Sequence, residues 1–278
     1  MSVQPRGERL LPGESGEQKV RRLALLEVSD IGVQFGGVQA LAGLSFTIDE
    51  GQICALIGPN GAGKTTLFNV VSRLYQPSSG SLRFADNDLL ALAPHRIAPL
   101  GIARTFQNLA LVPGLSVIDN VIVGSHPRTS GGLWAAALWF PQRAQERRVR
   151  AKAMDILAGL DLAHLALRPC AGLPYGTLKR IEIARSLMAE PRLLMLDEPA
   201  SGLTHGEVNE LGDVIRRLRD QQALTVLLVE HHMGMVMGIS DKVVVMALGQ
   251  KISEGRPAEV QADPVVISAY LGESVEDI

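Results

Sequence analysis

The sequence predicts an α/β fold in which helices cover both faces of a mainly parallel β-sheet. The composition is that of a globular protein, because 46% of the 278 residues are hydrophobic and 20% are charged. Glycine is plentiful at 28 residues and aromatic residues make up only 4%. Short apolar runs alternate with segments of helical periodicity, which is typical of strands buried on both faces of a sheet.

The first hundred residues predict strands mixed with short helices. Residues 1–25 are polar and contain Gly and Pro, so we expect a flexible N-terminal tail. Alternation and turn residues predict strands, and helical spacing predicts helices, in the following ranges: strands within 25–37 and 78–89 and on both sides of Glu50-Gly51, and helices at 63–74 and 94–101.

The second half predicts helices first and a parallel strand–helix alternation afterwards. The expected elements are a helical stretch over 115–160 broken near 124–132, helices at 178–189, 206–220 and 232–239, strands at 192–197 and 223–229, and a strand pair around 248–250. We expect one domain over 26–272, with its core in about 26–107 and 190–256, a helical subdomain inserted at about 108–189, and a C-terminal helical tail at 257–278.

Charge, cysteine usage and hydropathy narrow the class of protein. A net charge of −2 gives no broad attraction to nucleic acid. Cys54 and Cys170 form no CxxC pair, which indicates a reducing compartment and no zinc site. The apolar stretch 131–140 is about half the roughly 20 residues that span a bilayer, so we expect a cytosolic protein. A mean hydropathy of +0.16 fits either a large core or an apolar face reserved for a partner.

A phosphate-binding loop is the clearest chemical motif. The run GPNGAGKT matches the pattern G-x-x-x-x-G-K-[ST], and it follows the apolar strand ICALI and precedes a helix. Its glycines let backbone N–H groups surround a phosphate at the helix N-terminus. Lys64 adds a positive charge for the β- and γ-phosphates, and the Thr65 hydroxyl is placed for Mg²⁺. The predicted nucleotide-binding residues here are Gly58, Pro59, Asn60, Gly61, Ala62, Gly63, Lys64, Thr65 and Thr66.

A second motif supplies two carboxylates. The run LLMLDEP is an apolar strand that ends in Asp197 and Glu198. A buried parallel strand delivers these residues to the C-terminal edge of the sheet, where ligands bind. We expect Asp197 to hold Mg²⁺ and Glu198 to be the base that activates water. The two motifs together predict an ATP-hydrolysing P-loop NTPase with a RecA-like core.

These residues resemble the ATP-binding subunits of ABC transporters, over about residues 26–272. The resemblance implies that Phe35 stacks on adenine and that Gln107 joins the core to the helical subdomain and senses Mg²⁺ and the γ-phosphate. It also implies that His231, in LLVEHHM, lies near the γ-phosphate and acts in catalysis. Two further stretches match the family: its signature motif, at Leu173–Thr177, and the loop that crosses the dimer interface, at Ala200–Thr204. In this architecture an antiparallel β region flanks the parallel core.

The match narrows to importers of branched-chain amino acids, and to the larger of their two ATPase subunits. The stretches QFGGVQALAGLSF and DPVVISAYLGE and the long segment 125–160 carry this likeness. It implies a second ABC ATPase subunit, transmembrane permease subunits and, indirectly, a substrate-binding protein as partners, at the cytoplasmic face of the inner membrane. The alternative function is a soluble ATPase of the same fold that acts as a nucleotide-switched interaction or regulatory protein.

The signature motif departs from the family pattern. Pro174 stands where a serine is expected, and it removes both a hydroxyl and an N–H. In the family two chains face each other, and each ATP lies between one phosphate loop and the other chain's signature. Gly176 still permits the signature to approach the other chain's ATP closely, and we expect Thr177 to offer a substitute hydroxyl. The departure predicts a heterodimer with a different ATPase subunit, in which the site completed by Pro174 is the weaker one.

A basic helical run lies at residues 142–154. It fits a solvated helix face, and it also fits a surface near anionic lipid headgroups, each charge then contributing about 1 kcal/mol. The sequence pattern favours the solvated face.

Overall fold

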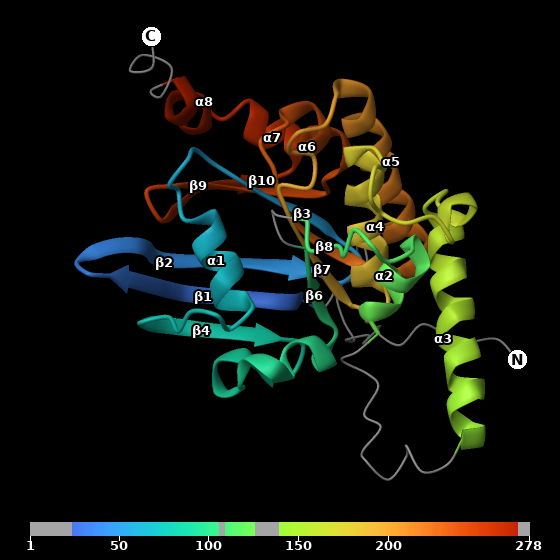
Figure 1. Ribbon diagram of the computed structural model, residues 1–278. Helices are drawn as coiled ribbons and strands as arrows, with labels where there is room; N and C mark the ends of the chain where they lie inside the picture. The colour runs from blue at the N-terminus through green and yellow to red at the C-terminus, as the bar shows by residue number, and fades with distance from the viewer. Residues whose placement is uncertain (1–23, 106–108, 126–138, 272–278) are drawn as a thin grey trace, which may run out of the picture.

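The structure is a computed structural model that describes residues 24–105, 109–125 and 139–271. It contains two β-sheets and the helices that pack on them (Figure 1). The expected N-terminal tail lies outside the described residues, apart from Ala24 and Leu25, which belong to the first strand. This arrangement agrees with the predicted α/β class.

The smaller sheet is antiparallel and has four strands in the order β2-β1-β4-β5. Its strands are β1 (Ala24–Phe35), β2 (Val38–Asp49), β4 (Ser79–Phe84) and β5 (Asn87–Asp88). Gly36 and Gly37 make the β1–β2 turn with φ values of 50° and 93°, which side chains rarely adopt. The expected antiparallel region is thus a separate sheet that lies against the parallel core.

The larger sheet has six strands in the order β10-β9-β3-β8-β7-β6, and all its pairs are parallel except β9–β10. Its strands are β3 (Ile53–Ile57), β6 (Ile102–Arg104), β7 (Leu193–Asp197), β8 (Thr225–Val229), β9 (Lys242–Ala247) and β10 (Gln250–Gly255). Every residue of β3, β7 and β8 is buried, as their apolar runs predict. Strand β6 has only three residues, too few for an alternation, so the sequence pattern does not indicate it.

The helices agree with the predicted ranges to within a few residues. They are α1 (Lys64–Val71), α2 (Val117–Val123), α3 (Trp139–Gly159), α4 (Tyr175–Leu187), α5 (His205–Gln222), α6 (Met233–Ile239), α7 (Pro257–Gln261) and α8 (Pro264–Leu271). The predicted helix at 94–101 consists of two short 3₁₀ helices, Pro94–Arg96 and Ala98–Leu100. Helix α5 begins with a capping box between Thr204 and Glu207, which fixes its first turn.

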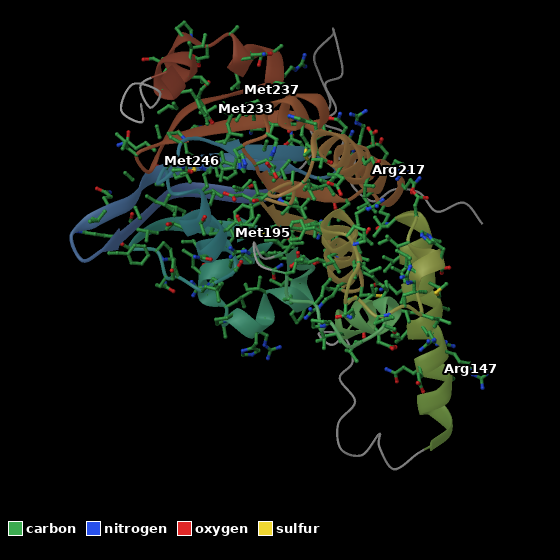
Figure 2. The ribbon with its side chains drawn as sticks, turned by 45° about the horizontal axis from the view of Figure 1, so that its top comes forward. Arg147, Met195, Arg217, Met233, Met237 and Met246 are labelled. Carbon is green, nitrogen blue, oxygen red and sulfur yellow. The ribbon has the colours of Figure 1, made fainter. Side chains whose placement is uncertain are left out.

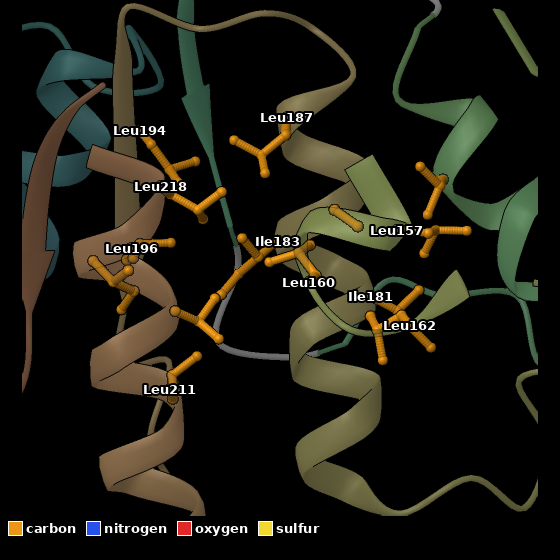
Figure 3. Close-up of a cluster of buried hydrophobic side chains, with 14 of the residues drawn as sticks. Leu157, Leu160, Leu162, Ile181, Ile183, Leu187, Leu194, Leu196, Leu211 and Leu218 are labelled. Atoms are coloured by element: carbon orange, nitrogen blue, oxygen red, sulfur yellow. The ribbon is translucent and has the colours of Figure 1, made fainter. Parts of the chain in front are cut away.

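A large apolar core joins the parallel sheet to the helical segment. Leucines and isoleucines of α4 meet those of β7 and α5 on one side and of α3 on the other (Figure 3). Helix α3 stands at the edge of the molecule, and the Arg147 side chain points into solvent there (Figure 2). No described helix is both long enough and apolar enough to cross a bilayer.

Candidate nucleotide-binding site

The phosphate-binding loop runs from the end of β3 to the start of α1, as predicted. Gly63 caps α1 with a left-handed backbone, and Lys64 and Thr65 are the first two residues of the helix. The first N–H groups of α1 therefore point out of the helix toward the loop, where they can bind phosphate oxygens. Thr65 is exposed at this end.

Two glycines of the loop are required by packing. A Cβ on Gly58 would lie 2.0 Å from the Met246 carbonyl oxygen, and one on Gly63 would lie 2.6 Å from the Ala40 carbonyl oxygen. Gly61 has a φ of 77° and open space where its Cβ would be. The loop is therefore held tightly by β9 and β2 on one side and is open on the other, where a ligand can approach.

The Lys64 ammonium group lies over the loop. Its Nζ donates to the carbonyl oxygens of Gly58 and Pro59 at 2.5 and 2.8 Å. These bonds hold the positive charge at the mouth of the loop, next to the helix N-terminus. Both features attract anions, so the position suits a phosphate group.

Asp197 lies at the C-terminal end of β7 in a buried network. Its Oδ2 accepts a hydrogen bond from Arg104 Nη2 at 2.7 Å, and the Asp197 N–H faces Thr105 Oγ1 at 3.4 Å. The Arg104 side chain also donates to Asn69 Oδ1 at 2.8 Å, which joins β6 and β7 to helix α1. An ion pair between residues 93 positions apart has no local sequence signal, so the motifs alone do not indicate Arg104.

Glu198 and His231 lie beside Asp197 on neighbouring strand ends. Asp197 pairs with Val229 in the β7–β8 ladder, and the Glu198 N–H donates to the Val229 carbonyl at 2.9 Å. Glu198 has a φ of 47°, an uncommon backbone conformation that is frequent at functional sites. The His231 side chain is 60% exposed, so it faces the space in front of this edge.

Phe35 ends β1 and meets an aromatic residue that the motifs do not indicate. Its ring lies 5.1 Å from that of Tyr75, at 71°, and 46% of Phe35 is exposed. This edge-to-face pair is a common aromatic geometry. It leaves part of the Phe35 surface open to solvent, where a planar base can stack.

The signature segment forms the start of α4. Pro174 is the N-cap residue and makes no side-chain cap bond, so the helix begins at Tyr175. A Cβ on Gly176 would lie 2.7 Å from Glu207 Oε1, so the start of α4 lies against the Glu207 side chain of α5. Thr177 is only 8% exposed, so the expectation that its hydroxyl replaces the missing serine is not supported.

The structure thus gathers most predicted residues at one edge of the parallel sheet. Strands β3, β8 and β7 are neighbours and parallel, so the loop after β3, the acids after β7 and the histidine after β8 lie together. Gly176 instead packs against α5, and Gln107 lies outside the described residues. Glu230 and His232 lie beside His231. The His232 Nδ1 lies 3.0 Å from Glu230 Oε2, and the ring centroids of His231 and His232 are 4.6 Å apart.

Comparison with known proteins identifies the family. The family model described as ABC transporter matches residues 41–201, and the model described as branched-chain amino acid ATP-binding cassette transporter matches residues 250–276. The first of these covers more than half of the chain. The chain is 41% identical over 251 residues to the high-affinity branched-chain amino acid transport ATP-binding protein BraF of Pseudomonas aeruginosa, covering 90% of this chain and 98% of that protein.

Two further proteins are similar to this chain over most of its length. The corresponding protein LivG of Escherichia coli strain K12 is 39% identical over 254 residues, with the same coverage. The solved ADP conformation of MJ1267, an ATP-binding cassette of an ABC transporter, is 32% identical with a TM-score of 0.79, covering 90% of this chain and 99% of that one. The chain therefore belongs to the ABC transporter family, as an ATP-binding, ATP-hydrolysing subunit of the branched-chain amino acid transport type.

Proposed function

We propose that the chain hydrolyses ATP at its own phosphate loop and thereby drives an importer of branched-chain or related amino acids. One observation supports the ATP site. The neighbouring parallel strands β3, β7 and β8 lead into the phosphate loop, into Asp197-Glu198 and into the segment with His231. The amino-acid cargo rests on the names of BraF and LivG.

We propose the following role for each site residue. The residues Gly58, Pro59, Asn60, Gly61, Ala62, Gly63, Lys64, Thr65 and Thr66 hold the phosphates through N–H groups, the Lys64 charge and hydroxyls. Phe35 stacks on adenine from the end of β1. Glu198 orients the attacking water and accepts its proton, and His231 lies beside the γ-phosphate. Gln107, which follows β6 in the sequence, senses the γ-phosphate.

The residues at this edge fit Mg²⁺. The Thr65 hydroxyl and the Asp197 carboxylate are hard oxygen donors, which Mg²⁺ prefers, and each lies at an end of a rigid element. Gln107 would add an amide oxygen. When bound, Mg²⁺ neutralises charge on the β- and γ-phosphates. Asp197 keeps one carboxylate oxygen on Arg104, which leaves the other oxygen for the metal shell.

We also propose that the native partner is a different ATPase subunit. Gly176 and the start of α4 would complete the partner's ATP site, while the partner's signature completes the site of this chain. Pro174 lacks a hydroxyl and a cap bond at this contact. Each lost charge-assisted hydrogen bond costs roughly 1.5–3 kcal/mol, so the site that Pro174 completes is the weaker one. Equal ATP turnover at both sites of the assembled pair would contradict this proposal.

A groove between core and helices suits a permease. A cavity of about 340 Å³ lies between the ends of α1, β6 and α4, and its lining includes Leu74, Pro94, Ile97, Arg104, Gly124 and Arg185. Arg185 also donates to the Ala110 carbonyl at 2.5 Å, which fastens the segment after Gln107 to α4. We propose that helices α2, α3 and α4 form the inserted subdomain, and that a permease segment binds in this groove at the cytoplasmic face of the inner membrane.

The test of the ATP site is nucleotide binding by the purified chain and by Lys64→Ala. Loss of the charged hydrogen bonds should weaken Mg·ATP binding about 10- to 100-fold. Lys251→Ala is the matched control, because within the part of the chain that the structure describes Lys251 pairs only with Glu254 on β10, and this variant should bind as wild type does. Equal affinity of Lys64→Ala and wild type would contradict the proposed site. Co-purification with permease subunits from membranes tests the transport role separately.

A further inference from the structure

A buried carboxylate lies between two loops of the ATP site. The Glu230 side chain has no exposed surface, and Glu230 directly follows strand β8 and precedes His231. Four nitrogen atoms surround its two oxygens. Carboxylate oxygens accept hydrogen bonds, so this side chain fits a set of N–H donors.

The two oxygens of Glu230 face different segments. Oε2 accepts from the backbone N–H groups of His231 and His232 at 2.9 and 3.2 Å, and the His232 Nδ1 lies 3.0 Å away. Oε1 accepts from the backbone N–H of Ala200 at 2.7 Å, across 30 residues of sequence. One side chain therefore ties the loop after β8 to the first residue of the loop Ala200–Thr204.

Carboxylates hold both ends of the loop Ala200–Thr204. The neighbouring Ala200 is fully buried, so its N–H has no access to water. The other end of the same loop is fixed independently, because Glu207 accepts from the N–H and the hydroxyl of Thr204 at 2.9 and 2.8 Å. These bonds to Thr204 also hold the pKa of Glu207 below its usual range. Glu230 thus contacts the Ala200 end of the loop, and Glu207 separately holds the Thr204 end.

We propose that Glu230 is a positioning residue that transmits the state of His231 to the loop Ala200–Thr204, and through that loop to the second ATPase subunit. The inference rests on the proposed placement of His231 beside the γ-phosphate. Contact between His231 and the nucleotide shifts the backbone of His231 and His232. The carboxylate follows those N–H groups and carries the N–H of Ala200 with it.

Hydrogen exchange of the purified chain, measured with and without AMP-PNP and Mg²⁺, tests this link. In the wild type, the nucleotide should slow exchange of the peptide containing Ala200–Leu203 at least about tenfold. The key variant is Glu230→Asp, whose shorter carboxylate still reaches the N–H groups directly after it but not Ala200. It should bind AMP-PNP within about twofold of wild type, because Glu230 does not touch the phosphate loop, and the response at Ala200–Leu203 should be lost.

Two further variants make the outcome clear. Glu230→Gln places an amide N–H₂ against backbone donors and should lose the same response. Glu207→Gln is the matched control, because it loosens the Thr204 end of the loop and should keep the response at Ala200. A Glu230→Asp protein that binds the nucleotide and responds like wild type would overturn the inference. A wild type that binds AMP-PNP without any response at the loop would overturn it too, and a wild type that does not bind at all would refute the proposed ATP site with it.

Discussion

Arg104 and Asp197 form an ion pair at 2.7 Å in which both side chains are less than a tenth exposed. The two residues come from the neighbouring strands β6 and β7, 93 positions apart in the sequence. The proposed Mg²⁺ carboxylate is therefore held from the side by a strand that also leads to Gln107. The same guanidinium reaches Asn69 near the end of α1, so one side chain fixes three elements of the site.

Arg104→Met should destabilise the chain by about 3–5 kcal/mol, because it leaves the Asp197 carboxylate buried without a partner. The double variant Arg104→Met/Asp197→Asn should recover most of this loss, since no charge then stays buried. Urea unfolding measures both. Arg217→Met is the control, because its pair with Asp161 is about half exposed and should contribute less than about 1 kcal/mol. Equal losses for Arg104→Met and Arg217→Met would contradict the assignment.

Glu198→Gln should lower ATP turnover about 10²–10⁴-fold while ATP binding persists. The reason is that the amide cannot accept the proton of the attacking water, yet it fills the same space at the same left-handed backbone position. Steady-state turnover and equilibrium binding on the same preparation separate the two effects. Glu210→Gln, an exposed change on α5, should leave both unchanged. Near-normal turnover of Glu198→Gln would show that another residue acts as the base.

Gly58→Ala should weaken nucleotide binding at least about tenfold and lower stability by about 1–3 kcal/mol. The added Cβ would lie 2.0 Å from the Met246 carbonyl oxygen, so the loop or β9 has to move. Thermal unfolding and binding of Mg·ATP measure the two losses. Gly206→Ala is the control, because its Cβ meets nothing in the first turn of α5. A Gly58→Ala protein with wild-type affinity would show that the loop tolerates this shift.

The sequence predicted the α/β class and most elements because local patterns determine them. The burial of β3, β7 and β8 follows from three apolar runs, and the phosphate loop follows from one motif. The contacts that complete the site are not local. Arg104, Tyr75 and Glu230 carry no spacing signal of their own, because each has a partner in a distant part of the chain. The buried Thr177 shows the converse, since a motif position does not determine whether a side chain is exposed.

Cys54 should make stability fall at alkaline pH. Burial raises the pKa of this thiol to about 12 in the folded chain, with the nearby Lys242 opposing the effect. The folded state thus keeps the proton, and the stabilisation is complete below pH 9 and is lost as the pH rises from about 9 toward 12. Between pH 8 and 10, wild type should lose roughly 1 kcal/mol more than Cys54→Ala in urea unfolding. Ala55→Gly, a small change on the same strand with no ionisable group, should show the wild-type pH dependence.

Pro174→Ser tests whether the altered signature limits the ATP site that it completes. Serine at the N-cap of α4 should accept from the N–H of Gly176 or Thr177 and stabilise the chain by about 1 kcal/mol. It also restores a hydroxyl at the contact with a second chain's γ-phosphate. The purified chain without other subunits can pair only with itself, so each ATP site then uses this signature.

We therefore expect little or no ATP turnover by the wild-type chain alone and measurable turnover by Pro174→Ser. Pro174→Ala is the matched control, because it removes the ring and restores the N–H without supplying a hydroxyl. Activity in the serine variant and not in the alanine variant would assign the defect to the missing hydroxyl. Equal turnover by all three proteins would show that the segment works as it stands, and a heterodimer would then no longer be required to explain ATP hydrolysis by this chain.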